Sequence, residues 1–296
     1  MKAIPRLLAP AVLAFASAAA LAQAPGVSAG AAAAPRLLPG IEAQLKTADA
    51  WAIKGTYLPA QPGERTFVLL HGSGMRRQVW RTLAARLQRA GLGYLAIDLR
   101  GHGESAVGPD GKPANWRGFK VTKTENEFAN MTLDVSAAFS YLSGQGVSEE
   151  GAGLIGIEVG GSLALKYAAV HPKVPMVVML SPGMSYQEIL TVNAMRAYKD
   201  RPILMIYSEL ERGSAKATPL LYEIARRSAG ERNATLISVG DRRGARMLTG
   251  ALAQRIVEWL QNPVKPEAPA PSTSTLFAPA AESSGAVDAE DSGAEP

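Results

Sequence analysis

Residues 153–168 (GLIGIEVGGSLALKYA) constrain the fold more strongly than any other stretch of the chain. A short apolar run stops at Glu158, two glycines follow, and apolar residues then recur with helical spacing. This order predicts a buried strand, a sharp turn and a helix. Small residues on both sides of the turn let the strand and helix backbones approach closely, and they push the Glu158 side chain outward.

Length and composition predict one sizeable folded domain with extensions at both ends. The chain has 296 residues, of which 47% are apolar, enough for one hydrophobic core. It contains no cysteine, which excludes disulfides, thiolate catalysis and zinc–thiolate sites. It has only three histidines, His71, His102 and His171, and these are the candidates for an imidazole base.

The N-terminal 40 residues have the composition of an export signal and a leader. Residues 1–22 combine Lys2 and Arg6 with an apolar stretch and an Ala-Leu-Ala site. We expect a signal peptide cleaved after Ala22, and hence a periplasmic or secreted protein, with an uncleaved membrane anchor as the alternative. Residues 23–40 are rich in Ala, Gly and Pro and are expected to form a flexible leader. No later stretch is apolar enough to span a bilayer.

The other end of the chain, residues 263–296, is rich in Pro, Ala and Ser and is expected to be a disordered tail. It carries six acidic residues and one lysine, whereas the whole chain has a formal net charge of +5. A basic body with an acidic tail could contact itself or an anionic surface. The basic residues are scattered and lack interleaved aromatics, so we expect no nucleic-acid partner.

Between these ends, in residues 41–262, short apolar runs alternate with helical patterns. We expect strands over 51–58, 66–70, 94–97, 154–157, 176–180, 203–207 and 235–239, with 51–58 at the sheet edge. We expect helices over 79–90, 130–142, 219–229 and 251–260, and a short helical cap segment over 185–197. This alternation predicts an α/β fold with a mostly parallel central sheet and helices on both faces.

Three motifs in sequential order resemble the α/β-hydrolase superfamily, in particular its serine-esterase, dienelactone-hydrolase-like and peptidase-like branches. They are FVLLHGSG, DLRGHGES and GLIGIEVGGS, and the resemblance extends over residues 43–261. It implies an α/β-hydrolase fold, with ligands bound at the carboxyl ends of the strands.

The resemblance also implies where catalytic groups would stand. In that superfamily a nucleophile on the elbow, a carboxylate and a histidine act together, in that chain order. The corresponding positions here hold Glu158, Glu211 and Arg243, so all three depart from the pattern. The backbone amides of Ser73 and Val159 stand where the superfamily forms its oxyanion hole.

The substituted positions cannot support the usual mechanism. Arginine stays protonated and cannot act as the base. Glu158 could attack as a carboxylate, but no base would then activate water. We therefore expect a non-catalytic pseudo-hydrolase that binds a small molecule or a protein, with an active hydrolase of ester or amide bonds as the alternative. A chain of Glu158, Arg243 and Glu211 would be either a site for a polar or charged ligand or a structural ion network.

Further candidates lie in the motif loops. His71 and His102 are candidate binding residues, with a hydrogen-bonded structural role as the alternative. Ser73, Ser105 and Ser162 are rival nucleophiles, and a Ser73–His102 pair is the one combination with a base. No pattern calls for a cofactor or a metal. A third hypothesis is a structural or assembly factor that acts through the acidic tail.

Overall fold

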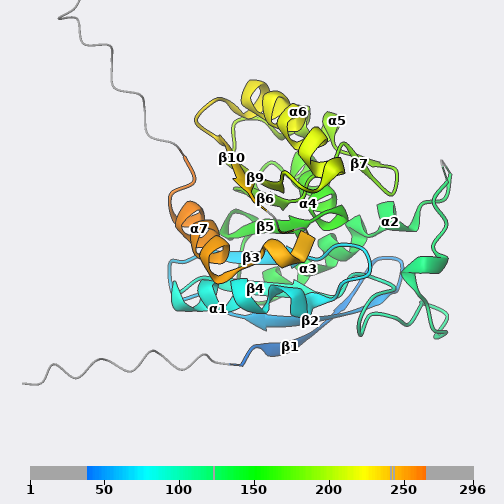
Figure 1. Ribbon diagram of the computed structural model, residues 1–296. Coiled ribbons are helices and arrows are strands. Elements are labelled where there is room, and N and C mark those ends of the chain that lie inside the picture. The colour runs from blue at the N-terminus through cyan, green and yellow to red at the C-terminus, as the bar shows by residue number, and fades with distance from the viewer. Residues whose placement is uncertain (1–38, 123, 241, 243, 265–296) are drawn as a thin grey trace, which may run out of the picture. The chain divides into compact units, whose positions relative to one another are not determined.

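The computed structural model describes residues 39–122, 124–240, 242 and 244–264. Their centre is an eight-stranded sheet with the order β1-β2-β4-β3-β5-β6-β9-β10 (Figure 1). Its strands are β1 (Ile41–Lys46), β2 (Ala52–Leu58), β3 (Thr66–Leu70), β4 (Gly93–Ile97), β5 (Ala152–Ile157), β6 (Val177–Leu180), β9 (Ile203–Ser208) and β10 (Ala234–Val239). β2 runs antiparallel to its neighbours β1 and β4, and the other pairs in this sheet are parallel.

Helices cover both faces of the sheet (Figure 1). One face carries α1 (Arg81–Arg89) and α7 (Gly250–Gln261). The other carries α2 (Glu127–Asn130), α3 (Thr132–Gly144), α4 (Val159–Val170), α5 (Val192–Tyr198) and α6 (Arg212–Ala229). The predicted α/β-hydrolase architecture, a mostly parallel sheet between two helical layers, is thereby confirmed.

The burial of the strands explains why their sequences are continuously apolar. Every residue of β3, β4, β5 and β6 is buried, because helices pack on both sides of these parallel strands. α1 and α7 instead bury one apolar stripe each, as surface helices do. Within the described part of the chain, no helix is both long and apolar enough to cross a membrane.

Three predicted elements were wrong in detail. Residues 51–58 form β2 but not the edge strand, because β1 pairs with its outer side. The predicted helical cap over 185–197 begins instead with a hairpin of β7 (Ser185–Tyr186) and β8 (Ile189–Leu190), and only α5 is helical. α6 begins at Arg212, seven residues before the predicted start at Pro219, which lies inside the helix.

Candidate functional site

Glu158 connects β5 to α4 in a strained backbone conformation. Its φ of 51° and ψ of −116° lie outside the regions that non-glycine residues favour. The glycines around it are sterically required: a Cβ on Gly156 would lie 2.3 Å from the Gly160 backbone, and one on Gly160 would lie 2.2 Å from the Leu70 carbonyl oxygen. The sharp strand–turn–helix geometry expected from the sequence is therefore present, with a carboxylate at its apex.

Backbone from two distant loops surrounds the Glu158 carboxylate. A Cβ on Gly72, in the loop after β3, would lie 2.7 Å from Glu158 Oε2. A Cβ on Gly244, in the loop after β10, would lie 3.0 Å from Glu158 Oε1. Among the residues that the structure describes, none donates a hydrogen bond to this carboxylate. Burial, and secondarily the negative charge of Glu211, raise the pKa of Glu158.

Glu211, the residue at the predicted acid position, follows β9 and faces the same region. Its Oε2 accepts a hydrogen bond of 2.7 Å from Ser181 Oγ. Ser181 lies at the end of β6 with a positive φ of 48°, and its carbonyl accepts a 2.9 Å hydrogen bond from the Tyr186 hydroxyl. Burial raises the pKa of Tyr186, and the charges of Glu158 and Glu211 raise it further. The fold thus gathers two carboxylates with a tyrosine and a serine.

Sequence reasoning missed Ser181 and Tyr186. The available signal was the run SPGMSY directly after the apolar strand 177–180. Polar residues that follow a parallel strand lie at the carboxyl edge of the sheet, where ligands bind in α/β folds.

Arg243, at the predicted base position, lies outside the described residues. Its neighbour Gly244 is described, with a φ of 49° and the close approach to Glu158 given above. The chain therefore passes the elbow immediately after Arg243, and the side chain of that residue stays a prediction.

His71 is fully buried, and backbone groups hold both of its ring nitrogens. Nδ1 lies 2.8 Å from the Gly72 carbonyl oxygen, and Nε2 accepts a 3.0 Å hydrogen bond from the Leu99 amide. This pairing requires the neutral ring with the proton on Nδ1. Burial lowers the pKa of His71 to about 4. His71 therefore has no nitrogen available to take a proton from a nucleophile.

His102 is also held by its loop. Its Nδ1 lies 2.9 Å from the Arg100 carbonyl oxygen, and its ring stacks on Trp116 with centroids 5.5 Å apart. Burial lowers the pKa of His102. These contacts fit the structural role that the sequence analysis gave as the alternative for both histidines. A ligand-binding role for His71 and His102 stays a prediction.

His171 lies too far along the chain of α4 to serve Glu158. It caps the C-terminus of α4, whose N-cap is Glu158, and the 12 helical residues between them span roughly 18 Å. Its Nδ1 contacts Glu149 Oε1 at 2.8 Å. Among the described residues, no hydrogen bond or ion pair joins any of the three histidines to the Glu158 carboxylate.

Two of the rival serines have structural hydrogen bonds. Ser105 Oγ accepts a 2.9 Å bond from the Lys54 amide, and Ser162 Oγ bonds back to the Glu158 carbonyl at 3.4 Å. Both are buried. Ser73 is half-buried in the loop after β3, and Val159 is the buried first residue of α4. The oxyanion-hole role of the Ser73 and Val159 amides stays a prediction.

Comparison with known proteins places this geometry in context. A sequence profile described as alpha/beta hydrolase fold matches residues 65–218. No curated protein sequence matches the chain. A dienelactone hydrolase structure from Anabaena variabilis is similar, at 20% identity and a TM-score of 0.59, over 76% of this chain and 98% of that one. An esterase structure from Pyrococcus furiosus is similar at 18% identity and a TM-score of 0.59, over 78% of this chain and 97% of that one.

Proposed function

Because the chain belongs to the alpha/beta hydrolase fold family, we propose that it is an exported, non-catalytic member that binds a polar or charged small molecule, or a protein, in the hydrolase crevice. The observation that carries this proposal is the elbow itself. Glu158 occupies the nucleophile position in the strained turn, and no described hydrogen bond or ion pair joins it to any of the three histidines.

The chemistry of these groups favours binding over turnover. Ester or amide hydrolysis by this fold needs a base that activates the nucleophile and later water. A carboxylate that attacks an ester leaves an acyl-enzyme, which water must then hydrolyse with the help of a base. Arg243, the residue in the base position, stays protonated at any ordinary pH. The first half of such a reaction could proceed, but the enzyme would not regenerate.

In the proposed site, Arg243 forms an ion pair with Glu158 or Glu211. The positions that hold the nucleophile, the base and the acid in hydrolases then hold an anion, a cation and an anion. The N-terminus of α4 favours a negative charge at Glu158. Burial and the charge of Glu211 work against that charge, because they raise the pKa of Glu158, so the proposal requires a cation nearby. No ion pair to Glu158 is found within the described part of the chain, and guanidinium groups pair well with carboxylates on two sides.

A second candidate function is an active hydrolase in which Glu158 is the nucleophile. The observation that favours it is the elbow strain, which persists although no serine is present. The similar structures described as a dienelactone hydrolase and an esterase belong to active enzymes of this fold, but at 18–20% identity they establish the fold alone. A third, the assembly factor acting through the acidic tail, depends on residues 265–296, which lie outside the described residues.

Esterase assays separate the first two functions. Wild-type protein should hydrolyse p-nitrophenyl acetate and butyrate no faster than buffer does. The triple variant Glu158→Ser, Glu211→Asp, Arg243→His restores nucleophile, acid and base, and should gain turnover. Each single variant should stay inactive, because triad members act as a unit. Wild-type hydrolysis that Glu158→Gln abolishes would refute the binding function and establish a carboxylate nucleophile.

A further inference from the structure

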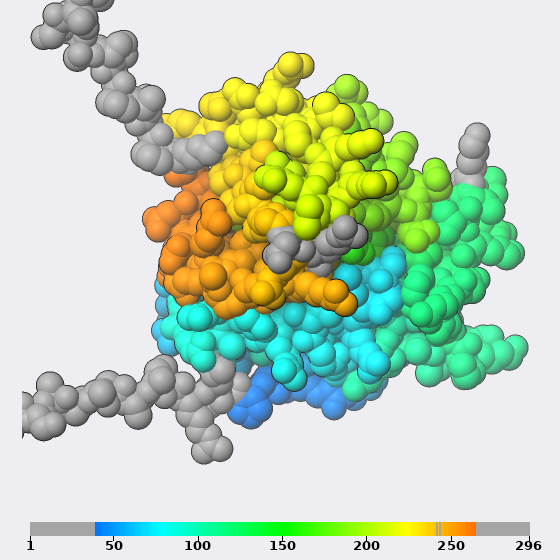
Figure 2. All heavy atoms as spheres, viewed as in Figure 1, coloured from blue at the N-terminus to red at the C-terminus, as the bar shows by residue number. Residues whose placement is uncertain are grey.

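The largest cavity that we describe lies away from the elbow, against the long loop between β4 and α2. Its volume is about 660 Å³, within the range of small-molecule sites. Two short hairpins of the loop frame it, closed by bridges between Val107 and Pro113 and between Val121 and Asn126. In the space-filling view this loop (green) lies at the surface beside the cyan residues that follow β3 (Figure 2). We refer to it as the loop cavity.

Aromatic rings form the floor of the loop cavity. Trp51 and Phe119 both line it and meet edge to face, with ring centroids 6.1 Å apart. The Arg100 guanidinium lies 5.2 Å from the Trp51 ring centroid and fixes the indole from another side. Trp51 is only 6% exposed, so its ring is held in place before any ligand arrives.

The charged side chains that line the cavity already have partners. Glu127 Oε1 accepts a 2.8 Å bond from Arg100, Lys120 pairs with Glu125 at 2.9 Å, and Lys112 pairs with Asp110 at 3.5 Å. An ionic ligand would have to compete with these existing pairs. A purely apolar ligand would displace water from the charged side chains of the rim and offer them no hydrogen bonds in return, which is unfavourable.

Two residues that line the cavity keep unused hydrogen-bonding capacity. Asn130 donates its amide to Glu127 Oε2 at 2.9 Å, and none of the described residues donates to its Oδ1. Nor does any described residue accept a bond from the indole Nε1 of Trp51. The lining residues therefore include a neutral donor and a neutral acceptor besides the aromatic rings, together with the hydroxyl-bearing Thr124.

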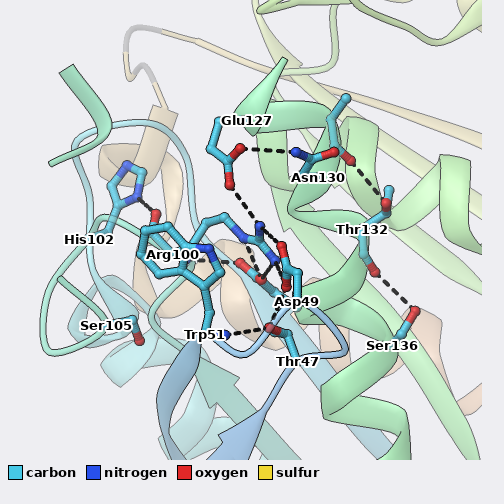
Figure 3. A network of polar contacts seen from close by, with 12 residues as sticks. Thr47, Asp49, Trp51, Arg100, His102, Ser105, Glu127, Asn130, Thr132 and Ser136 are labelled. Carbon is cyan, nitrogen blue, oxygen red and sulfur yellow. Dashed lines mark hydrogen bonds and ion pairs between the residues drawn. The ribbon is translucent and has the colours of Figure 1, made fainter. Parts of the chain in front are cut away.

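A buried ion network holds Trp51 and Glu127, two of the residues that line the cavity (Figure 3). The buried guanidinium of Arg100 reaches Asp49 at 2.6 Å, Glu127 at 2.8 Å and Asp134 at 2.8 Å. These three carboxylates come from the β1–β2 turn, α2 and α3, so one side chain fixes three elements. Lining residues that are ordered before binding lower the entropic cost of holding a ligand.

We propose that the loop cavity binds a neutral polyhydroxylated ligand, a sugar. A sugar ring has apolar C–H faces that suit the floor of Trp51 and Phe119. Its hydroxyl groups both donate and accept, so one can donate to Asn130 Oδ1 while another accepts from Trp51 Nε1. Recognition needs no charge on the ligand and leaves the ion pairs of the rim intact. This site is independent of the crevice at Glu158.

NMR of the full-length protein labelled with ¹⁵N tests the proposal directly. The chain has four tryptophans, so its spectrum contains few indole N–H signals, and Trp51→Phe identifies the one from Trp51. Titration with D-glucose, D-galactose and N-acetyl-D-glucosamine, each up to about 50 mM to detect millimolar binding, should shift this signal saturably with at least one sugar. The signal of Trp259, which donates to Thr235 at 3.1 Å on the other helical layer, serves as the matched control and should not move.

Variants complete the test. Asn130→Ala should weaken binding of the same sugar by about 3- to 10-fold, as expected for the loss of one neutral hydrogen bond. Trp259→Phe should leave the affinity unchanged, and the spectra themselves report whether each variant is folded. A Trp51 signal that no sugar moves, or that moves with sodium acetate or methylammonium chloride instead, would overturn the proposal. So would an affinity that Asn130→Ala leaves unaltered.

Discussion

At the scale of single residues, Glu158 shows that backbone strain and side-chain chemistry are specified separately. The turn geometry depends on Gly156 and Gly160, because any Cβ there would collide with backbone at 2.3 Å or less. The residue at the apex of the turn contributes only the chemical group of its side chain. A carboxylate at this position therefore keeps the shape of a hydrolase elbow but lacks the hydroxyl of a serine nucleophile.

The proposed pairing of Arg243 predicts a stability change. Arg243→Ala should lower the free energy of unfolding at pH 7 by about 1–3 kcal/mol, between the values for exposed and fully buried ion pairs, because Glu158 and Glu211 are both half-buried. Urea denaturation at pH 7 measures this loss. Adding Glu158→Gln should recover most of it, since it removes the carboxylate left without a cation.

The pairing also predicts how the stability loss of Arg243→Ala changes with pH. Burial and Glu211 already raise the pKa of Glu158 above its unfolded value of 4.5, and removal of the proposed partner in Arg243→Ala should raise this pKa further. The folded state then binds more protons than the unfolded state, so stability falls as the pH rises above about 4.5. The deficit of the variant should be small near pH 4 and largest at pH 7. An equal deficit at both pH values, or no rescue by Glu158→Gln, would contradict the pairing.

His71 predicts a separate sensitivity to acid. Its pKa falls from 6.5 to about 4 because burial favours the neutral ring. The unfolded chain binds the proton more readily, so the stability that neutral His71 contributes is present above pH 6.5 and is lost as the pH falls towards 4. Between pH 7 and pH 4 this amounts to about 3 kcal/mol. Urea denaturation measures the free energy of unfolding of wild type and His71→Asn at both pH values. The decrease from pH 7 to pH 4 should be smaller in the variant by this amount, and an equal decrease in the two proteins would refute the prediction.

The sequence alone identified part of the candidate site. The positions of Glu158 and Glu211 follow from motif order, and the structure brings both to the region of Tyr186. Ser181 and Tyr186 could not be found in this way, because a serine and a tyrosine after a strand carry no motif. Only the fold shows that the end of β6 lies beside the end of β9.

At the scale of elements, buried strands were easier to predict than edges. β3 and β5 read as continuous apolar runs because both of their faces are covered. β1 has the sequence IEAQLK and buries only Ala43 and Leu45, so it carries too few apolar residues to stand out after a low-complexity leader. Its absence from the prediction made β2 look like the edge.

α6 was predicted too short for a physical reason. Proline is favoured at the first position of a helix, and the preceding residues 212–218 (RGSAKAT) contain no large apolar side chain. In the structure Ser214 and Thr218 of this segment are buried and share a 3.2 Å hydrogen bond, and Thr218 donates to the Pro182 carbonyl at 3.2 Å. Polar tertiary contacts, which sequence periodicity does not reveal, therefore position the first turns of α6.

Arg201 links several element ends and predicts a large local effect. Its guanidinium donates to the carbonyl groups of Ala168, His171, Val174 and Tyr198 at 2.6–3.1 Å, and so satisfies the C-terminus of α4. Arg201→Met should lower the free energy of unfolding by about 2–3 kcal/mol, because it leaves several carbonyls without donors. Hydrogen exchange should quicken at the end of α4.

A matched control for Arg201 is Arg226, which forms ion pairs with Glu223 and Glu231 on the surface of α6. Exposed pairs contribute little, so Arg226→Met should leave stability and exchange unchanged. Equal effects of the two substitutions would mean that Arg201 acts only as a surface charge.

At the scale of the whole molecule, the extensions should be separable from the fold. α7 ends at Gln261, and residues 263–296 have almost no apolar surface to dock on it. Truncation after Asn262 should shift the thermal midpoint by less than about 2 °C. Calorimetry of the two proteins measures this shift. A fall above about 5 °C would show that the tail packs on the body, and loss of a bound partner on truncation would favour the assembly hypothesis.

The N-terminal extension makes the last prediction, because it decides where the whole molecule works. Lys2 and Arg6 precede an apolar stretch, and an Ala-Leu-Ala site ends at Ala22. These are the three regions that export machinery recognises, so the mature chain should begin at Gln23. Mass spectrometry of protein recovered from outside the cytoplasm should show this terminus. Ala20→Asp or Ala22→Asp, which removes a small residue from the cleavage site, should leave the precursor uncleaved, whereas Ala24→Asp should be processed normally. Recovery of the wild type only as a full-length cytosolic chain would exclude export.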